Sequence, residues 1–138
     1  MKNSMNDGEL FKAFEAGTLD PRSFDHQMHL RVGWLYVCRY PLAAAVLNFA
    51  SNLKSWTQAI GAEGKYHETI TWFFMLIINE RQGVTRAETF DDFIKENIDL
   101  LAKNPPILDR YYSRELLASE HARNHYVLPD RLERRSVA

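Results

Sequence analysis

The segment from Asp25 to Arg39 constrains the fold more than any other part of the chain. Its apolar residues do not form one stripe but are spread around most of the circumference of a helix. They are Leu30, Val32, Trp34, Leu35 and Val37. A helix that is apolar on nearly every side is buried among several neighbours. We therefore expect a central helix over residues 25–39, around which the rest of the chain packs.

Further segments with helical spacing flank this one, and glycine or proline separates them. Gly17 ends a short first helix, and Pro41 both stops the central helix and suits the first turn of the next. The remaining helices are expected at residues 42–60, 66–82 and 89–102, with one or two short helices between 107 and 126. We predict an all-α fold, an up-and-down helical bundle of about five helices plus short C-terminal helices.

The length of 138 residues is that of one domain, so we expect a single helical domain over residues 1–138. Terminal residues of domains are commonly poorly ordered, and we expect residues 1–6 and 131–138 to be frayed.

Composition narrows the classes of partner. Lys and Arg number 17 and Asp and Glu number 18, so the chain lacks the basic excess typical of nucleic-acid-binding proteins. The single cysteine, Cys38, allows no intrachain disulfide, and we expect it to be buried. The longest apolar run, residues 72–78, is far shorter than the roughly 20 residues of a membrane span. Without a recognisable signal peptide, these features predict a cytoplasmic protein that binds neither nucleic acid nor membrane.

Histidine and glutamate residues mark one predicted pole of the bundle. His26 and His29 are three residues apart and share a helix face, while His67 and Glu68 begin a later helix. Short connections make sequential helices antiparallel, so the N-terminal ends of the second and fourth helices fall at the same end of the domain. We therefore expect three imidazoles and one carboxylate at this pole.

Such a group fits a divalent metal such as zinc or iron, because imidazole is a common ligand of both. In this interpretation His26, His29 and His67 are the metal ligands and Glu68 is a further ligand or a catalytic general base. We expect Tyr66, Thr71 and Arg31 to contact these four residues and hold them in place without binding the metal themselves.

Three other interpretations stay open. One histidine and Glu68 could act as acid and base without a metal. Two helix N-termini with Gly64 and Lys65 could bind an anion. The same side chains could also be purely structural, with Asp25 capping its helix and Glu68 favouring a helix start.

The function hypotheses follow from these sites. The leading one is a metal-binding protein or metal-dependent enzyme acting on an unknown small molecule. The alternative is a non-catalytic module that binds a small anion or a protein partner. In one form of that alternative the chain is a homodimer that uses exposed aromatic residues such as Trp56 or Tyr112.

Several short motifs together resemble a family of small, uncharacterised, all-helical bacterial proteins. They are Phe24-Asp25-His26, His29-Leu30-Arg31, Lys65 to Thr71, Tyr111-Tyr112-Ser113 and Val127 to Asp130. The resemblance spans about residues 14–130. It implies a bacterial cytosolic protein and supplies no mechanism.

Overall fold

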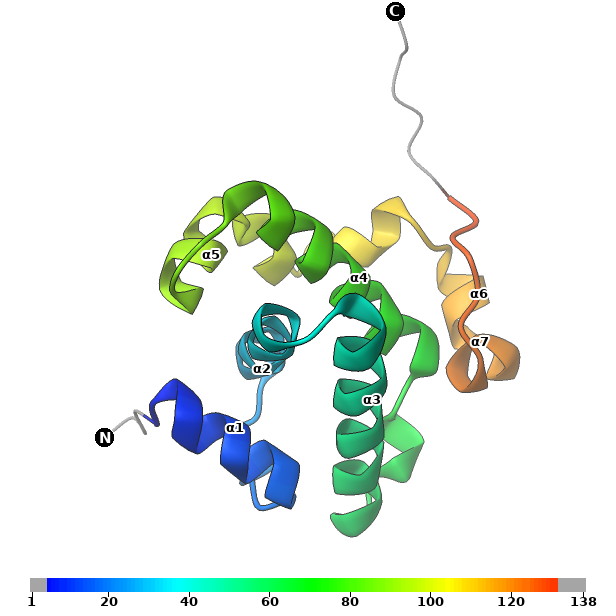
Figure 1. Cartoon of the computed structure of the whole chain (residues 1–138). Coiled ribbons are helices and arrows are strands. Elements are labelled where there is room, and N and C mark those ends of the chain that lie inside the picture. The colour runs from blue at the N-terminus through cyan, green and yellow to red at the C-terminus, as the bar shows by residue number, and fades with distance from the viewer. Residues whose placement is uncertain (1–4, 132–138) are drawn as a thin grey trace, which may run out of the picture.

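The structure, a computed structural model, describes residues 5–131 and is built from helices joined by short loops (Figure 1). The α-helices are α1 (Asp7–Ala16), α2 (His26–Arg39), α3 (Leu42–Ala59), α4 (Glu68–Thr85), α5 (Phe90–Glu96), α6 (Arg114–Ala118) and α7 (Glu120–Asn124). Short 3-10 helices lie at Glu63–Lys65, Ile98–Leu101 and Ile107–Arg110. No strand occurs among residues 5–131, and the all-α prediction is confirmed.

Side-chain caps set where the helices begin. Asn6 and Asp25 accept hydrogen bonds from the backbone at the starts of α1 and α2, and Thr89 does so for α5. At the other end of α1, Gly17 adopts the left-handed conformation with φ of 73°. Asn6, which we expected to be frayed, thus has a defined place as the cap of α1. Residues 1–4 and 132–138, also expected to be frayed, lie outside the described residues.

The expected central helix is α2, which packs against α1, α3 and α4. Figure 1 shows α2 nearly end-on and α3 from the side, so these two helices of the bundle cross. Tyr36 of α2 is fully buried, and its ring contacts Phe11 and Phe14 of α1 and Phe49 of α3. Contacts on several sides explain why apolar residues surround this helix in the sequence.

The N-terminal halves of α2 and α4 lie against each other, and so do their C-terminal halves. The rings of His26 and Phe74 are 5.2 Å apart, and the Trp34 indole nitrogen donates to the Gln82 side-chain oxygen at 2.8 Å. Between these two contacts, Gly33 allows close approach, because a Cβ there would lie 3.0 Å from the sulfur of Met75.

Two of the predicted boundaries that differ from the structure do so for clear local reasons. The fourth helix begins at Glu68 rather than Tyr66, because His67 takes the capping position. The fifth ends at Glu96, because the Asn97 side chain donates to the Phe93 carbonyl at 2.8 Å and competes with the helical backbone.

Three predicted burial states are wrong. Cys38 is exposed. Trp56 is buried, with its indole nitrogen donating to the Leu19 carbonyl, and Tyr112 is buried, with its hydroxyl donating to the Val127 carbonyl. Neither aromatic residue is on the surface, so a homodimer, which stays a prediction, would have to use other residues.

No helix within residues 5–131 combines the length and the apolar character needed to cross a membrane.

Candidate functional site

The candidate site is an apolar cavity of about 280 Å³ between α2, α3 and α4. Its apolar wall is formed by Leu30, Phe49, Leu53, Ile70, Phe74, Met75 and Ile78. Its polar lining comes from His26, His29 and Thr71. An apolar pocket with a few converging polar groups is the usual form of a small-molecule site.

The His26 ring is oriented by a residue far away in the sequence. Its Nε2 lies 2.9 Å from the carbonyl oxygen of Leu100, and the ring also meets the edge of Phe74. A carbonyl oxygen only accepts hydrogen bonds, so Nε2 carries the proton and donates. Nδ1 is therefore left with a lone pair and has no partner among the described residues.

The His29 ring is held in the opposite tautomer. Its Nδ1 lies 2.8 Å from the carbonyl oxygen of Asp25 and must donate to it, so that Nε2 keeps its lone pair. The ring stacks on Phe24 with 3.9 Å between the ring centres. Burial lowers the pKa of His29 below its ordinary value, His26 lowers it further, and the bond to Asp25 opposes the shift.

The two free imidazole nitrogens are accessible. No buried side-chain nitrogen or oxygen among residues 5–131 lacks a hydrogen-bond partner. The free nitrogens of His26 and His29 have no such partner, so both must open onto the cavity or the solvent. Each can accept a proton or a hydrogen bond from a bound molecule.

Thr71 adds a third polar group to the cavity. Its hydroxyl donates at 2.8 Å to the carbonyl oxygen of His67, one turn earlier in α4. The hydroxyl proton is thereby used inside the helix, and the oxygen remains an acceptor.

His67 does not line the cavity. Its Nδ1 accepts from the Ile70 backbone N–H at 3.2 Å, and its Nε2 lies 2.7 Å from the Leu117 carbonyl, to which it must donate. The ring is fully used as a helix cap and as a link to α6. His67 precedes Phe74, the contact of His26, by seven residues, which is about 10 Å along α4. Neither ring nitrogen of His67 is therefore available to a ligand shared with the histidines of α2.

Glu68 is also already engaged. One carboxylate oxygen accepts from the Tyr66 hydroxyl at 2.7 Å and the other accepts from the Trp72 indole nitrogen at 3.1 Å. Burial raises the pKa of Tyr66, and the bond to Glu68 raises it further while Thr71 lowers it. The predicted catalytic carboxylate and Tyr66 therefore form a closed pair near Thr71, outside the residues that line the cavity.

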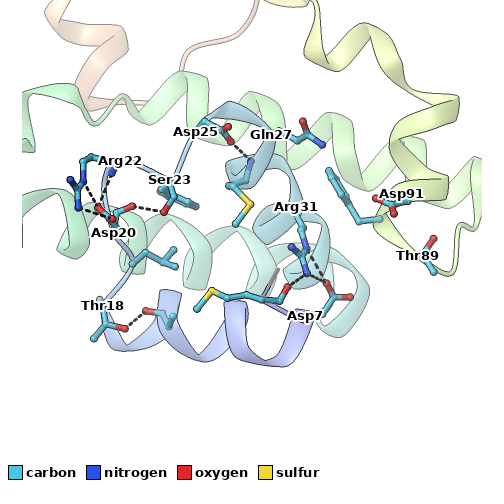
Figure 2. A pocket seen from close by; sticks show the side chains of 16 residues that line it. Asp7, Thr18, Asp20, Arg22, Ser23, Asp25, Gln27, Arg31, Thr89 and Asp91 are labelled. Carbon is cyan, nitrogen blue, oxygen red and sulfur yellow. Dashed lines mark hydrogen bonds and ion pairs between the residues drawn. The ribbon is translucent and has the colours of Figure 1, made fainter. Parts of the chain in front are cut away.

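Arg31 lies on a different face of α2. Its guanidinium donates to the Asp7 carboxylate at 2.7 Å and to the Met5 carbonyl at 2.9 Å (Figure 2). It ties α1 to α2 and does not support the histidines.

Figure 2 shows the larger groove, of about 950 Å³, to which Arg31 belongs. Its polar side chains mostly bond to one another or to nearby backbone: Arg22 pairs with Asp20, and Asp25 accepts from the Met28 backbone N–H. These contacts account for most charged residues of the groove as helix caps and surface ion pairs.

The predicted metal ligands are not gathered into one set. Within the described part of the chain, no group of three His, Cys, Asp or Glu side chains is arranged to hold a metal ion. Of His26, His29 and His67, only the first two meet at the cavity. A zinc or iron site stays a prediction, and the geometry limits it to these two imidazoles.

Sequence reasoning missed the contribution of α3 to the site. Phe49 and Leu53 line the cavity, but their helical spacing is the same as that of ordinary core residues. No sequence signal separates the two roles, because the cavity arises from how three helices fit together.

No family model matches the chain, and neither do any curated proteins or solved structures. The resemblance to a bacterial helical family therefore stays a prediction.

Proposed function

We propose that this protein binds a small, mainly apolar molecule in the cavity between α2, α3 and α4, with His26 and His29 contacting its polar group. The observation that carries the proposal is the pairing of an apolar, partly open cavity with two imidazole nitrogens that have no partner among the described residues. Two accessible acceptors without a protein partner, beside an apolar cavity, favour a small molecule that has a polar group.

The size of the cavity supports a ligand of about one ring with a short substituent. An engineered apolar cavity of about 150 Å³ is sufficient to hold benzene. The cavity here, at about 280 Å³, is larger. A ligand of this size would contact all three helices at once.

Binding of toluene, a purely apolar probe, tests this proposal. In ¹⁵N-labelled full-length protein we expect saturable amide shifts around the cavity, and intermolecular NOEs from toluene to the methyl groups of Leu53 and Ile70. The Leu53→Trp variant, which fills the cavity, should lose these shifts. Leu47→Trp is the matched control, because Leu47 lies on the same helix with 61% of its surface exposed.

The opposite results would reject the proposal. Toluene shifts that persist in Leu53→Trp would place binding elsewhere. An absence of both shifts and NOEs in the wild-type protein would mean that the cavity does not take up ligands of this size.

A divalent metal at His26 and His29 is the second candidate. Histidine ligands commonly donate their other ring N–H to a backbone carbonyl, and both residues do so here, to Leu100 and Asp25. Elemental analysis of the untagged protein is the test. We expect metal in the wild type that is lost in His29→Phe and retained in His67→Asn; metal-free wild-type protein from metal-replete growth would eliminate this candidate.

A further inference from the structure

Every side-chain polar group that lines the cavity is a hydrogen-bond acceptor. The ring protons of His26 and His29 are used by the carbonyl oxygens of Leu100 and Asp25, and the Thr71 hydroxyl proton is used by that of His67. What each group has left for a ligand in the cavity is a lone pair. A backbone carbonyl cannot exchange roles, so these tautomers are imposed by the fold.

The cavity also lacks a positive charge. No lysine or arginine is among its lining residues, and the nearby Arg31 is bound to Asp7 in the other groove. While both imidazoles are neutral, an anion placed in this cavity would lose part of its hydration and find neither a side-chain donor nor a cation, which is unfavourable.

From these two observations we infer that the cavity selects ligands whose polar group is a hydrogen-bond donor, a hydroxyl or an amine on an apolar body, and rejects carboxylates and phosphates. This inference rests on the proposed function, because it assumes that the cavity is occupied. It argues against the anion alternative for this cavity, since an anion needs donors.

The polar groups give the ligand a defined orientation. His26 and His29 are one turn apart on α2, and Thr71 lies on α4. A donor group would therefore lie beside the N-terminal halves of α2 and α4. The apolar body would point toward Leu53 and Phe49 of α3, where the lining has no polar side chain.

A pair of isomeric ligands tests the inference. 4-Methylphenol and methoxybenzene have the same formula and similar apolar surface, but only the phenol has an O–H to donate. We expect 4-methylphenol to bind the wild-type protein about two- to tenfold more tightly, the range expected for one net hydrogen bond. Benzoate should not bind at the same concentrations.

Variants show whether the cavity acceptors cause this preference. His29→Phe keeps an aromatic ring on Phe24 but removes the acceptor, and Thr71→Val keeps the side-chain shape but removes the hydroxyl. We expect the preference for the phenol to fall toward unity in at least one of these two variants. The Thr71 hydroxyl donates within α4, to the His67 carbonyl, so Thr71→Val keeps the test informative if His29→Phe fails to fold.

Other outcomes separate this inference from the proposed function. Equal affinities for the two isomers, with toluene still bound, would overturn donor selection but leave the cavity site intact. Benzoate binding more tightly than the phenol, or a preference unchanged in both variants, would likewise overturn donor selection. If toluene also fails to bind, the proposed function is wrong as well.

Discussion

The histidines illustrate, at the residue scale, how backbone partners decide what a side chain can do. His26 and His29 each donate one ring proton to a carbonyl and keep one free nitrogen, whereas His67 uses both nitrogens. The same residue type therefore serves as an open acceptor at two positions and as a helix cap at the third.

The pKa of His29 predicts a dependence of stability on pH. Burial lowers this pKa from its ordinary value of 6.5, so the folded protein binds fewer protons at His29 than the unfolded chain. The contribution of His29 to the free energy of unfolding is therefore complete above about pH 6.5 and is lost as the pH falls through the folded-state pKa.

Urea unfolding between pH 5 and pH 8 measures this effect. The wild-type protein should lose more stability on acidification than His29→Phe, which cannot be protonated there. The flanking Asp25 and His26 are unchanged in both proteins. Identical pH profiles for the two proteins would contradict the assignment.

The capping role of His67 predicts a graded response to substitution. His67→Asn keeps a side-chain acceptor at the start of α4, whereas His67→Ala removes it, so the alanine variant should be less stable by about 1 kcal/mol. Both variants lose the bond to Leu117. Denaturant unfolding compares them, and equal stabilities would show that the ring does not act as a cap.

At the scale of the elements, the packing of α2 against α4 shapes the cavity. A Cβ at Gly33 would lie 3.0 Å from the Met75 sulfur and 3.3 Å from Ile78, and both side chains also line the cavity. Because protein interiors are closely packed, a Cβ at Gly33 would displace these two side chains mainly toward the cavity.

Substitution of Gly33 should therefore affect binding more than stability. Gly33→Ala should weaken toluene binding, while the gain in helix propensity, up to about 1 kcal/mol, offsets the tighter contact. The matched control is Gly83→Ala in α4, where a Cβ meets nothing within 4 Å and stability should rise without a change in binding. Calorimetric titration and thermal unfolding measure both quantities; unchanged binding in Gly33→Ala would contradict this account.

Most elements were predictable from the sequence because their signals are local. Asn6, Asp25, Thr89 and Gly17 begin or end helices through contacts within a few residues. The central place of α2 was also predictable, because its apolar residues surround the helix.

The candidate site was only half predictable. Helical spacing places His26 and His29 on one face, but their tautomers depend on carbonyl groups, one of them at Leu100, 74 residues away from His26. The separation of His67 depends on the relative placement of α2 and α4. Spacing within one helix contains no information on either contact.

At the scale of the whole molecule, a buried hydroxyl of α4 helps to hold the C-terminal segment in place. The Thr69 oxygen, in α4, lies 2.7 Å from the carbonyl oxygens of Ala122 and His125 and accepts from the Val127 backbone N–H at 3.2 Å. Thr69 is fully buried, so if its hydroxyl were removed, no water could take its place as the hydrogen-bond partner of these backbone groups.

Removal of this hydroxyl should loosen the C-terminal segment. We expect Thr69→Val to lower the free energy of unfolding by about 1–3 kcal/mol, the cost of leaving buried polar groups unpaired. Amide hydrogen exchange over residues 120–131 should become faster. Thr71→Val is the control with a smaller effect, because the Thr71 hydroxyl donates within α4 and bonds to no group of the C-terminal segment; equal effects of the two variants would contradict this role.

The claim that the cavity offers only acceptors can be tested most directly by ¹⁵N NMR of the imidazole rings at pH 8, where free histidine is neutral. We expect His29 to be protonated at Nδ1 and His26 at Nε2, each ring with one unprotonated nitrogen. If either histidine has its proton on the other nitrogen, that ring would offer the cavity a donor, and the account of ligand selection would be wrong.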